Sequence, residues 1–138
     1  MALTLTLLNA GAERELKLFL NNGGLSLEDL RLRLYVNNHT PAVTDTASDY
    51  TICTLAGYSN INLSGGTWSV STSSGIADGT YTTQTFTFTA GGQTIYGVVL
   101  TDQSNNPLAA GLLDTPFTVP SLGGGLTVAP EIKDKQTS

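Results

Sequence analysis

Apolar and polar residues alternate in several short runs along the chain, and this pattern predicts β-strands. Near the amino end, Leu3, Leu5 and Leu7 alternate with threonines, which predicts a strand with one buried face. From Leu30 to Val36 the period of two recurs, and this segment is the clearest core strand in the chain. Shorter runs predict further strands at Tyr50–Leu55, Ile61–Leu63, Trp68–Thr72, Leu112–Val119 and Leu126–Val128.

One segment near the amino end has helical spacing instead. Residues 12–20 place Leu16, Phe19 and Leu20 on one helical face, which predicts a helix that buries this face. Leucines at every second position of the same segment also fit a strand, so that alternative stays open. The run Asn21–Gly24 ends either element.

The two β-rich runs between Thr83 and Thr101 are separated by Gly91-Gly92. A Gly-Gly pair between strands favours a two-residue hairpin turn, since glycine adopts positive φ without strain. The resulting register sets Phe88 opposite Ile95 and Phe86 opposite Gly97. One face of this hairpin then carries Phe86, Phe88, Ile95 and Val99, and we expect it to belong to the core.

The other face of the predicted hairpin is half apolar. It carries Thr85, Thr87, Tyr96, Val98 and Leu100. A monomer in water rarely exposes such a surface. We therefore expect a covering element or a partner there, and these five residues form the candidate interface.

Together these elements predict a mainly β protein: an antiparallel, jelly-roll-like β-sandwich with one short amino-terminal helix on its side or end. Residues 1–130 form a single β-sandwich domain, and residues 131–138 form a polar carboxy-terminal tail. The length of 138 residues fits one domain. Charged residues make up only 12% of the chain, which excludes a helical bundle or a coiled coil.

The charge distribution bears on possible partners. The formal net charge is −5, and the stretch from Leu34 to Ile132 contains no Lys or Arg. Nucleic acid and anionic membranes attract clustered cations, so we expect neither as a partner. No apolar run approaches the roughly 18 residues of a membrane-spanning helix.

Few residues offer catalytic or metal-binding chemistry. The only histidine, His39, lies in a predicted loop, where a solvated turn residue is the more common role. Asp45 and Asp49 in the same loop could offer carboxylates to Ca²⁺, but the spacing lacks the Gly and closing Glu of a dedicated calcium loop. A local turn bond from Asp49 or Ser48 is the favoured alternative. We expect no cofactor and no enzymatic activity.

Two further single residues have simple structural interpretations. Cys53 is the only cysteine, so no internal disulfide is expected and the thiol is interpreted as a small buried hydrophobe. Trp68 could stack on a sugar ring, but it alternates onto the same face as Val70, as a core tryptophan does.

The order of motifs resembles small structural proteins encoded by tailed bacteriophages. These motifs are "NAG" before the predicted helix, then "LRLYVNNHTPAVTDTASDYT", "GY", "GGTWSV" and "QTFTFTAGGQTIYGVVLTD". The resemblance covers the chain from Asn9 to about Pro130. It includes no catalytic residue.

The resemblance implies a capsid cement or decoration protein on the outer surface of the virion, made in the host cytoplasm. Such a protein would bridge neighbouring major capsid protein subunits, stabilise the assembled shell and associate with copies of itself as a homo-oligomer. The alternative is a tail or fibre component that binds a host glycan.

Overall fold

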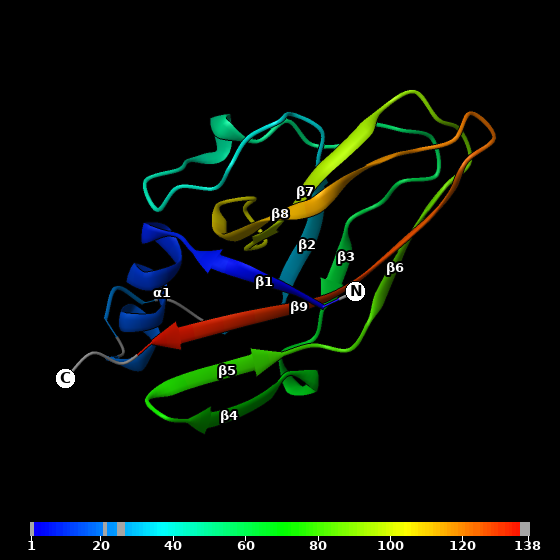
Figure 1. Ribbon diagram of the computed structural model, residues 1–138. Helices are drawn as coiled ribbons and strands as arrows, with labels where there is room; N and C mark the ends of the chain where they lie inside the picture. Colours follow the sequence, from blue (N-terminus) through cyan, green and yellow to red (C-terminus); the bar gives the residue numbers. More distant parts are fainter. Residues whose placement is uncertain (1, 21, 25–26, 136–138) are drawn as a thin grey trace.

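The computed structural model describes residues 2–20, 22–24 and 27–135 (Figure 1). The protein is mainly β with one amino-terminal α-helix, as the sequence predicts. The elements are β1 (Ala2–Leu7), α1 (Asn9–Phe19), β2 (Leu30–Tyr35), η1 (Ala47–Asp49), β3 (Ile61–Leu63), η2 (Gly65–Thr67), β4 (Ser69–Ser73), β5 (Ile76–Thr80), β6 (Gln84–Phe88), β7 (Thr94–Thr101), β8 (Pro107–Thr118) and β9 (Gly124–Lys135), where η marks a 3-10 helical turn.

The strands form one curled sheet that resembles half of a barrel (Figure 1). Its hydrogen-bonded order is β3-β2-β7-β8-β1-β9-β5-β4, with β6 also paired to β9. The turning point is β1. Its start pairs with β9 at Ala2 to Leu5, and its end pairs with β8 at Thr6 and Leu7. One short strand therefore joins the two wings of the sheet.

This topology departs from the expected antiparallel sandwich. The pairing of β1 with β9 is parallel, and the strands follow one continuous path instead of two separate sheets. Strand alternation reports which residues face a core. It does not report which strands are neighbours. The parallel pairing of the first strand with the last could therefore not be predicted from it.

The core lies inside the curl. Leu32 and Leu34 of β2 and Val98 and Leu100 of β7 are fully buried there. The other wing contributes further buried side chains, namely Leu3, Leu5, Phe86, Phe88, Leu126 and Val128. Cys53 is buried in the same cluster, as expected.

The outer face of β2 and β7 is covered as well, by the loop that follows β2. Tyr35, Tyr50 and Val99 pack there with Leu8 and Ala110 in a second buried cluster. The ring of Tyr35 lies so close to Gly97 that a Cβ on this glycine would collide with it. The centre of the sheet is therefore buried on both faces.

The expected hairpin at Gly91-Gly92 is wrong. Strand β6 pairs with β9, with Phe86 opposite Leu126, whereas β7 pairs with β2 and β8. Phe88 and Ile95 do share the core. Gly91 instead passes the backbone of the segment after β8, where its N–H donates to the Ser121 carbonyl at 3.3 Å and a Cβ would collide with Val119 and Pro120.

The helix expected near the amino end is confirmed, and the last strand is longer than expected. The helix begins at Asn9 and ends at Phe19, which rules out the strand alternative. Gly23 and Gly24 after it have positive φ, and Asn21 lies outside the described residues. Strand β9 runs to Lys135, so the expected boundary between residues 130 and 131 falls inside a strand. Residues 136–138 of the expected tail lie outside the described part.

Candidate functional site

The five candidate interface residues do not form one exposed face. Val98 and Leu100 are fully buried in the core, and Tyr96 is half-buried against the second cluster. Thr85 and Thr87 are exposed, but they lie on β6, away from β7 in the pairing. The single hairpin face that the sequence predicts for these residues is therefore not formed, because β6 pairs with β9 instead of β7 and a register shift near Gly97 changes which side chains face the core.

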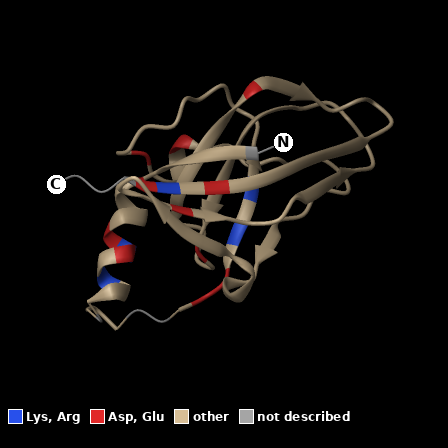
Figure 2. Cartoon of the chain, turned by 60° about the horizontal axis from the view of Figure 1, so that its bottom comes forward, with Lys and Arg blue, Asp and Glu red and all other residues tan. Residues whose placement is uncertain are grey.

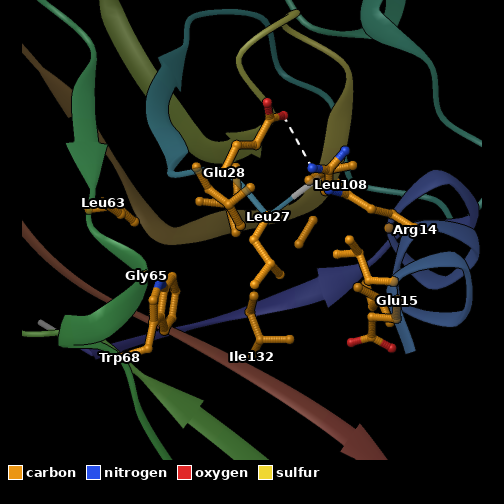
Figure 3. A pocket seen from close by; sticks show the side chains of 15 residues that line it. Arg14, Glu15, Leu27, Glu28, Leu63, Gly65, Trp68, Leu108 and Ile132 are labelled. Atoms are coloured by element: carbon orange, nitrogen blue, oxygen red, sulfur yellow. Dashed lines mark ion pairs between the residues drawn. The ribbon is translucent and has the colours of Figure 1, made fainter. Parts of the chain in front are cut away.

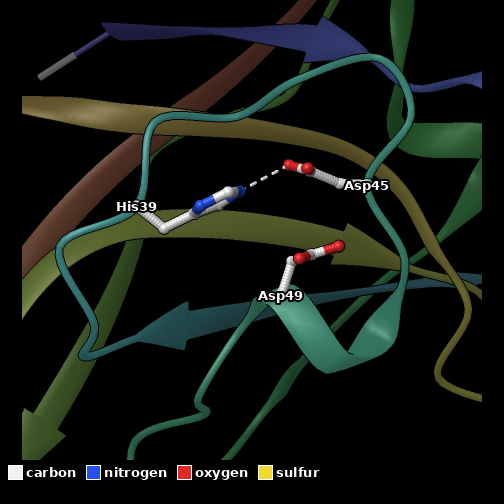
Figure 4. A group of neighbouring side chains, drawn as sticks. All are labelled: His39, Asp45 and Asp49. Atoms are coloured by element: carbon white, nitrogen blue, oxygen red, sulfur yellow. Dashed lines mark hydrogen bonds and ion pairs between the residues drawn. The ribbon is translucent and has the colours of Figure 1, made fainter.

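A second candidate, the loop of His39, Asp45 and Asp49, is held together by its own hydrogen bonds (Figure 4). One oxygen of Asp45, Oδ2, lies 2.7 Å from His39 Nε2 and accepts hydrogen bonds from the Tyr50 hydroxyl at 2.6 Å and the Ala42 N–H at 2.9 Å. Burial alone would raise the pKa of Asp45, but these hydrogen bonds outweigh it and lower the pKa.

The carboxylate of Asp49 completes a capping box, as it accepts a hydrogen bond from the Thr46 N–H at 2.8 Å. The favoured interpretation, a local turn bond at Asp49, is confirmed. One ligand atom from each of His39, Asp45 and Asp49 lies within 4.8 Å of the others. Because Asp45 and Asp49 already accept bonds that shape the loop, we assign this cluster a structural role.

An apolar hollow lies between the sheet and the inner face of α1 (Figure 3). Its volume is about 220 Å³. A second hollow of about 290 Å³ adjoins it, and the two share Glu15, Leu30, Trp68 and Ile132. We call the two together the groove. Its remaining apolar lining includes Leu7, Leu18, Leu27, Leu63, Val70 and Leu108.

The chain positions this groove through the close approach of α1 to β8. Gly11 is buried, and a Cβ on it would collide with the Leu108 carbonyl, so the start of the helix lies directly on the sheet. One and two turns further on, Arg14 and Leu18 line the groove on the same helical face. On the opposite wall, the Trp68 and Tyr81 rings pack in a T-shaped arrangement with their centres 5.1 Å apart.

Ion pairs close one end of the groove. Arg14 Nη2 lies 3.2 Å from Glu28 Oε1, and Arg14 Nη1 lies 3.7 Å from Asp102 Oδ2. Gln103 N also donates to Glu28 Oε1 at 3.3 Å. The one cation among the described lining residues is thus held by carboxylates of this same chain.

The rim on the β9 side carries negative charge. Glu15 and Asp134 both line the second hollow. Partial burial raises the pKa of Glu15, and the neighbouring Asp134 raises it further through its charge and a side-chain hydrogen bond. At this rim, the negative charge of Asp134 therefore makes ionisation of Glu15 less favourable.

Another surface feature is the outer side of α1. Leu16, Phe19 and the following Leu20, which the sequence predicts to be buried, are 61%, 86% and 64% exposed. We call them the α1 apolar face. The prediction fails because the helix turns Gly11, Arg14 and Leu18 toward the sheet instead. Trp68, by contrast, is partly buried against the core, close to its expected role.

Charge is unevenly distributed over the molecule. Figure 2 shows the cations on α1, on β2 and near the end of β9, with acidic groups spread more widely. No helix among the described residues is long and apolar enough to cross a membrane. No family model, curated protein or solved structure matches the chain.

Proposed function

We propose that this chain is a structural binding protein of a tailed-phage virion, a cement or decoration protein that attaches to the major capsid protein on the outer capsid. The observation that carries the proposal is the α1 apolar face. Three large apolar side chains project into water from the last turn of α1 and the residue that follows it, and such clusters mark protein contacts on soluble proteins. The motif resemblance to phage structural proteins supplies the choice of assembly.

The surroundings of this face suit an interface. The neighbouring side of the helix carries an ion pair between Lys17 Nζ and Glu13 Oε1 at 2.6 Å. An apolar centre with a charged margin is the usual composition of protein–protein contacts. The stretch from Leu34 to Ile132 contains acidic residues but no Lys or Arg. Its negative charge would steer the protein toward basic groups on its partner, while the apolar contact would hold the two together.

The mechanism is stabilisation by linkage. A protein that binds the assembled shell, and not its free subunits, shifts the equilibrium toward the shell by mass action. Bridging of adjacent major capsid protein subunits would therefore resist the internal pressure of packaged DNA. Self-association into a homo-oligomer would increase the number of contacts made at once.

A tail or fibre component that binds a host glycan remains the alternative. It calls for an exposed aromatic platform. Trp68, the aromatic residue that the sequence suggests for such a platform, is partly buried against the core and packs in a T-shaped arrangement with Tyr81, so this residue does not favour the alternative.

The test is attachment to capsids that lack the protein, taken from the phage that encodes it. Phe19→Asp should keep the far-UV circular dichroism of the parent and weaken attachment by roughly thirtyfold or more, as expected for a central interface side chain. Leu122→Asp is the matched control, because Leu122 is 93% exposed in the turn between β8 and β9, distant from α1 (Figure 1).

Equal attachment of Phe19→Asp and the parent would refute the role of the α1 apolar face. Loss of attachment in Leu122→Asp alone would place the contact at the other end of the molecule. If the parent fails to bind these capsids but binds intact tails or host polysaccharide, the alternative function is correct.

A further inference from the structure

The groove combines an apolar interior with a negatively charged rim. Leu18, Leu30 and Ile132 belong to its interior, while Glu15 lies at the junction of its two hollows. Figure 3 shows Trp68 on one side, Glu15 on the other and Ile132 between them. A molecule lying in the groove would thus contact apolar side chains, an aromatic ring and a carboxyl group at once.

The interior is large enough for a small ligand. An apolar cavity of about 150 Å³ accepts benzene, so the 220 Å³ hollow has room for a somewhat larger apolar group. Water is a poor occupant here, because the walls offer it few hydrogen-bond partners. The opening toward Val70 and Asp134 gives access from solvent.

The charges around the groove select the occupant. The charged lining residues are one cation, Arg14, and four acids, Glu15, Glu28, Asp78 and Asp134. Arg14 is engaged with Glu28 and Asp102, which leaves Glu15, Asp78 and Asp134 as the other lining acids, and of these Glu15 and Asp134 interact with each other. A positive charge placed beside that pair would relieve the repulsion between the two carboxylates, whereas a negative charge would increase it.

We propose that the groove binds a small apolar amine, an aliphatic or aromatic group that ends in a protonated amino group. The apolar part occupies the hollow between α1 and Ile132, and the ammonium group lies between Glu15, Asp134 and the ring of Trp68. Carboxylates bind an ammonium group through charge-assisted hydrogen bonds, and an indole face attracts a cation.

This site is separate from the surface proposed for capsid attachment. The α1 apolar face contributes none of the residues that line the groove. Ligand binding and attachment are therefore tested by different variants, and the failure of one proposal leaves the other standing.

The experiment titrates the full chain with three probes that share a six-carbon chain: hexylammonium, hexan-1-ol and hexanoate. Trp68 is the only tryptophan, so its fluorescence reports directly from the groove wall. We expect hexylammonium to bind about tenfold or more tightly than hexanoate, with hexan-1-ol between them. Amide NMR shifts should confirm that the perturbed residues line the groove.

Two variants with the same change in net charge separate local from general electrostatics. Glu15→Gln should reduce the preference for hexylammonium to about threefold or less. Glu13→Gln, on the same helix but outside the groove, should leave the preference unchanged. Leu27→Ser, at an 87% exposed position that lines the groove, should weaken all three probes alike.

Three results would overturn the proposal. Hexanoate could bind as tightly as hexylammonium, Glu13→Gln could reduce the preference as much as Glu15→Gln, or no probe could change the Trp68 fluorescence or the amide shifts of the lining residues. Phe19→Asp should bind hexylammonium as the parent does, which keeps this test independent of capsid attachment.

Discussion

The two sides of the curled sheet differ in how their apolar residues are used. On one side, β2 and β7 have the core on one face and the loop that carries Tyr50 on the other. On the other side, α1 covers the sheet with one helical face and leaves leucines and a phenylalanine in water. Leu32 is 0% exposed, whereas Leu16 is 61% exposed. The same residue type therefore packs in the core on one side and is exposed to solvent on the other.

The difference arises from geometry. A central strand has neighbours at both edges, and each of its faces can be covered independently. A helix that lies at the edge of a half-barrel turns a single stripe toward the sheet, here Gly11, Arg14 and Leu18, of which only Gly11 is fully buried. Gly11 and Arg14 occupy the side of the helix that faces the sheet. The large apolar residues Leu16 and Phe19 therefore lie on the side that faces solvent.

The largest expected contrast comes from one substitution made on both sides. Leu32→Ala should lower the free energy of unfolding by about 2–5 kcal/mol, because it removes buried methyl groups and leaves a cavity. Leu16→Ala should change it by less than about 0.5 kcal/mol, as is usual for an exposed position. Arg31→Ala, next to Leu32 on the other face of β2, should also cost far less than Leu32→Ala.

Denaturant titrations of the three variants measure these values. Similar losses for Leu32→Ala and Leu16→Ala would mean that the helix is covered in solution and that the two sides do not differ. Similar losses for Leu32→Ala and Arg31→Ala would mean that the faces of β2 are reversed.

A smaller contrast tests the packing of glycines. Gly97→Ala should lower the free energy of unfolding by about 1–3 kcal/mol, because its Cβ would collide with the Tyr35 ring and the Gly111 carbonyl. Gly66→Ala, near the groove, should be neutral or slightly stabilising, since a Cβ there meets nothing within 4 Å. Thermal unfolding of both variants decides the matter. A neutral Gly97→Ala would show that this side of the sheet tolerates extra volume.

The local pattern of the sequence predicted which segments form strands and helices better than it predicted which strands pair with each other. Alternation identified β1 and β2, and it placed Phe86, Phe88 and Ile95 in the core. The hairpin prediction gave β6 the wrong partner, because a Gly-Gly pair can be required by structural features other than a hairpin turn. At Gly91 the cause is the close passage of a distant backbone, which no short-range signal reveals.

The groove was not predicted, since its residues are far apart in the sequence. Arg14 and Asp134 contribute to the same hollow region from opposite ends of the chain. The spacing of Gly11, Arg14 and Leu18 did carry a signal for the inner face of the helix. A prediction from hydrophobicity alone instead assigned the buried face to the larger apolar residues Leu16 and Phe19, which are exposed.

The smallest expected effect is the pH dependence of stability contributed by two glutamates on α1. It has opposite signs for Glu15 and Glu13. The pKa of Glu15 is raised above the ordinary value of 4.5 by partial burial and by Asp134, so the folded state binds its proton more tightly than the unfolded state does. This group therefore favours folding at low pH, and its contribution is lost as the pH rises through the raised pKa. The pKa of Glu13 is lowered by the hydrogen bond and charge of Lys17, so its contribution is present above 4.5 and is lost as the pH falls through the lowered pKa.

Denaturant titrations of Glu15→Gln, Glu13→Gln and the parent between about pH 3 and pH 7 cover the range in which both carboxyl groups titrate. Relative to the parent, Glu15→Gln should gain stability as the pH rises, because the glutamine removes a carboxylate that repels Asp134. Glu13→Gln should lose stability over the same rise, because it removes the partner of Lys17, and salt should weaken this exposed effect. If both variants shift in the same direction, the net charge of the chain governs the response, and the groove rim is no different from the rest of the helix surface.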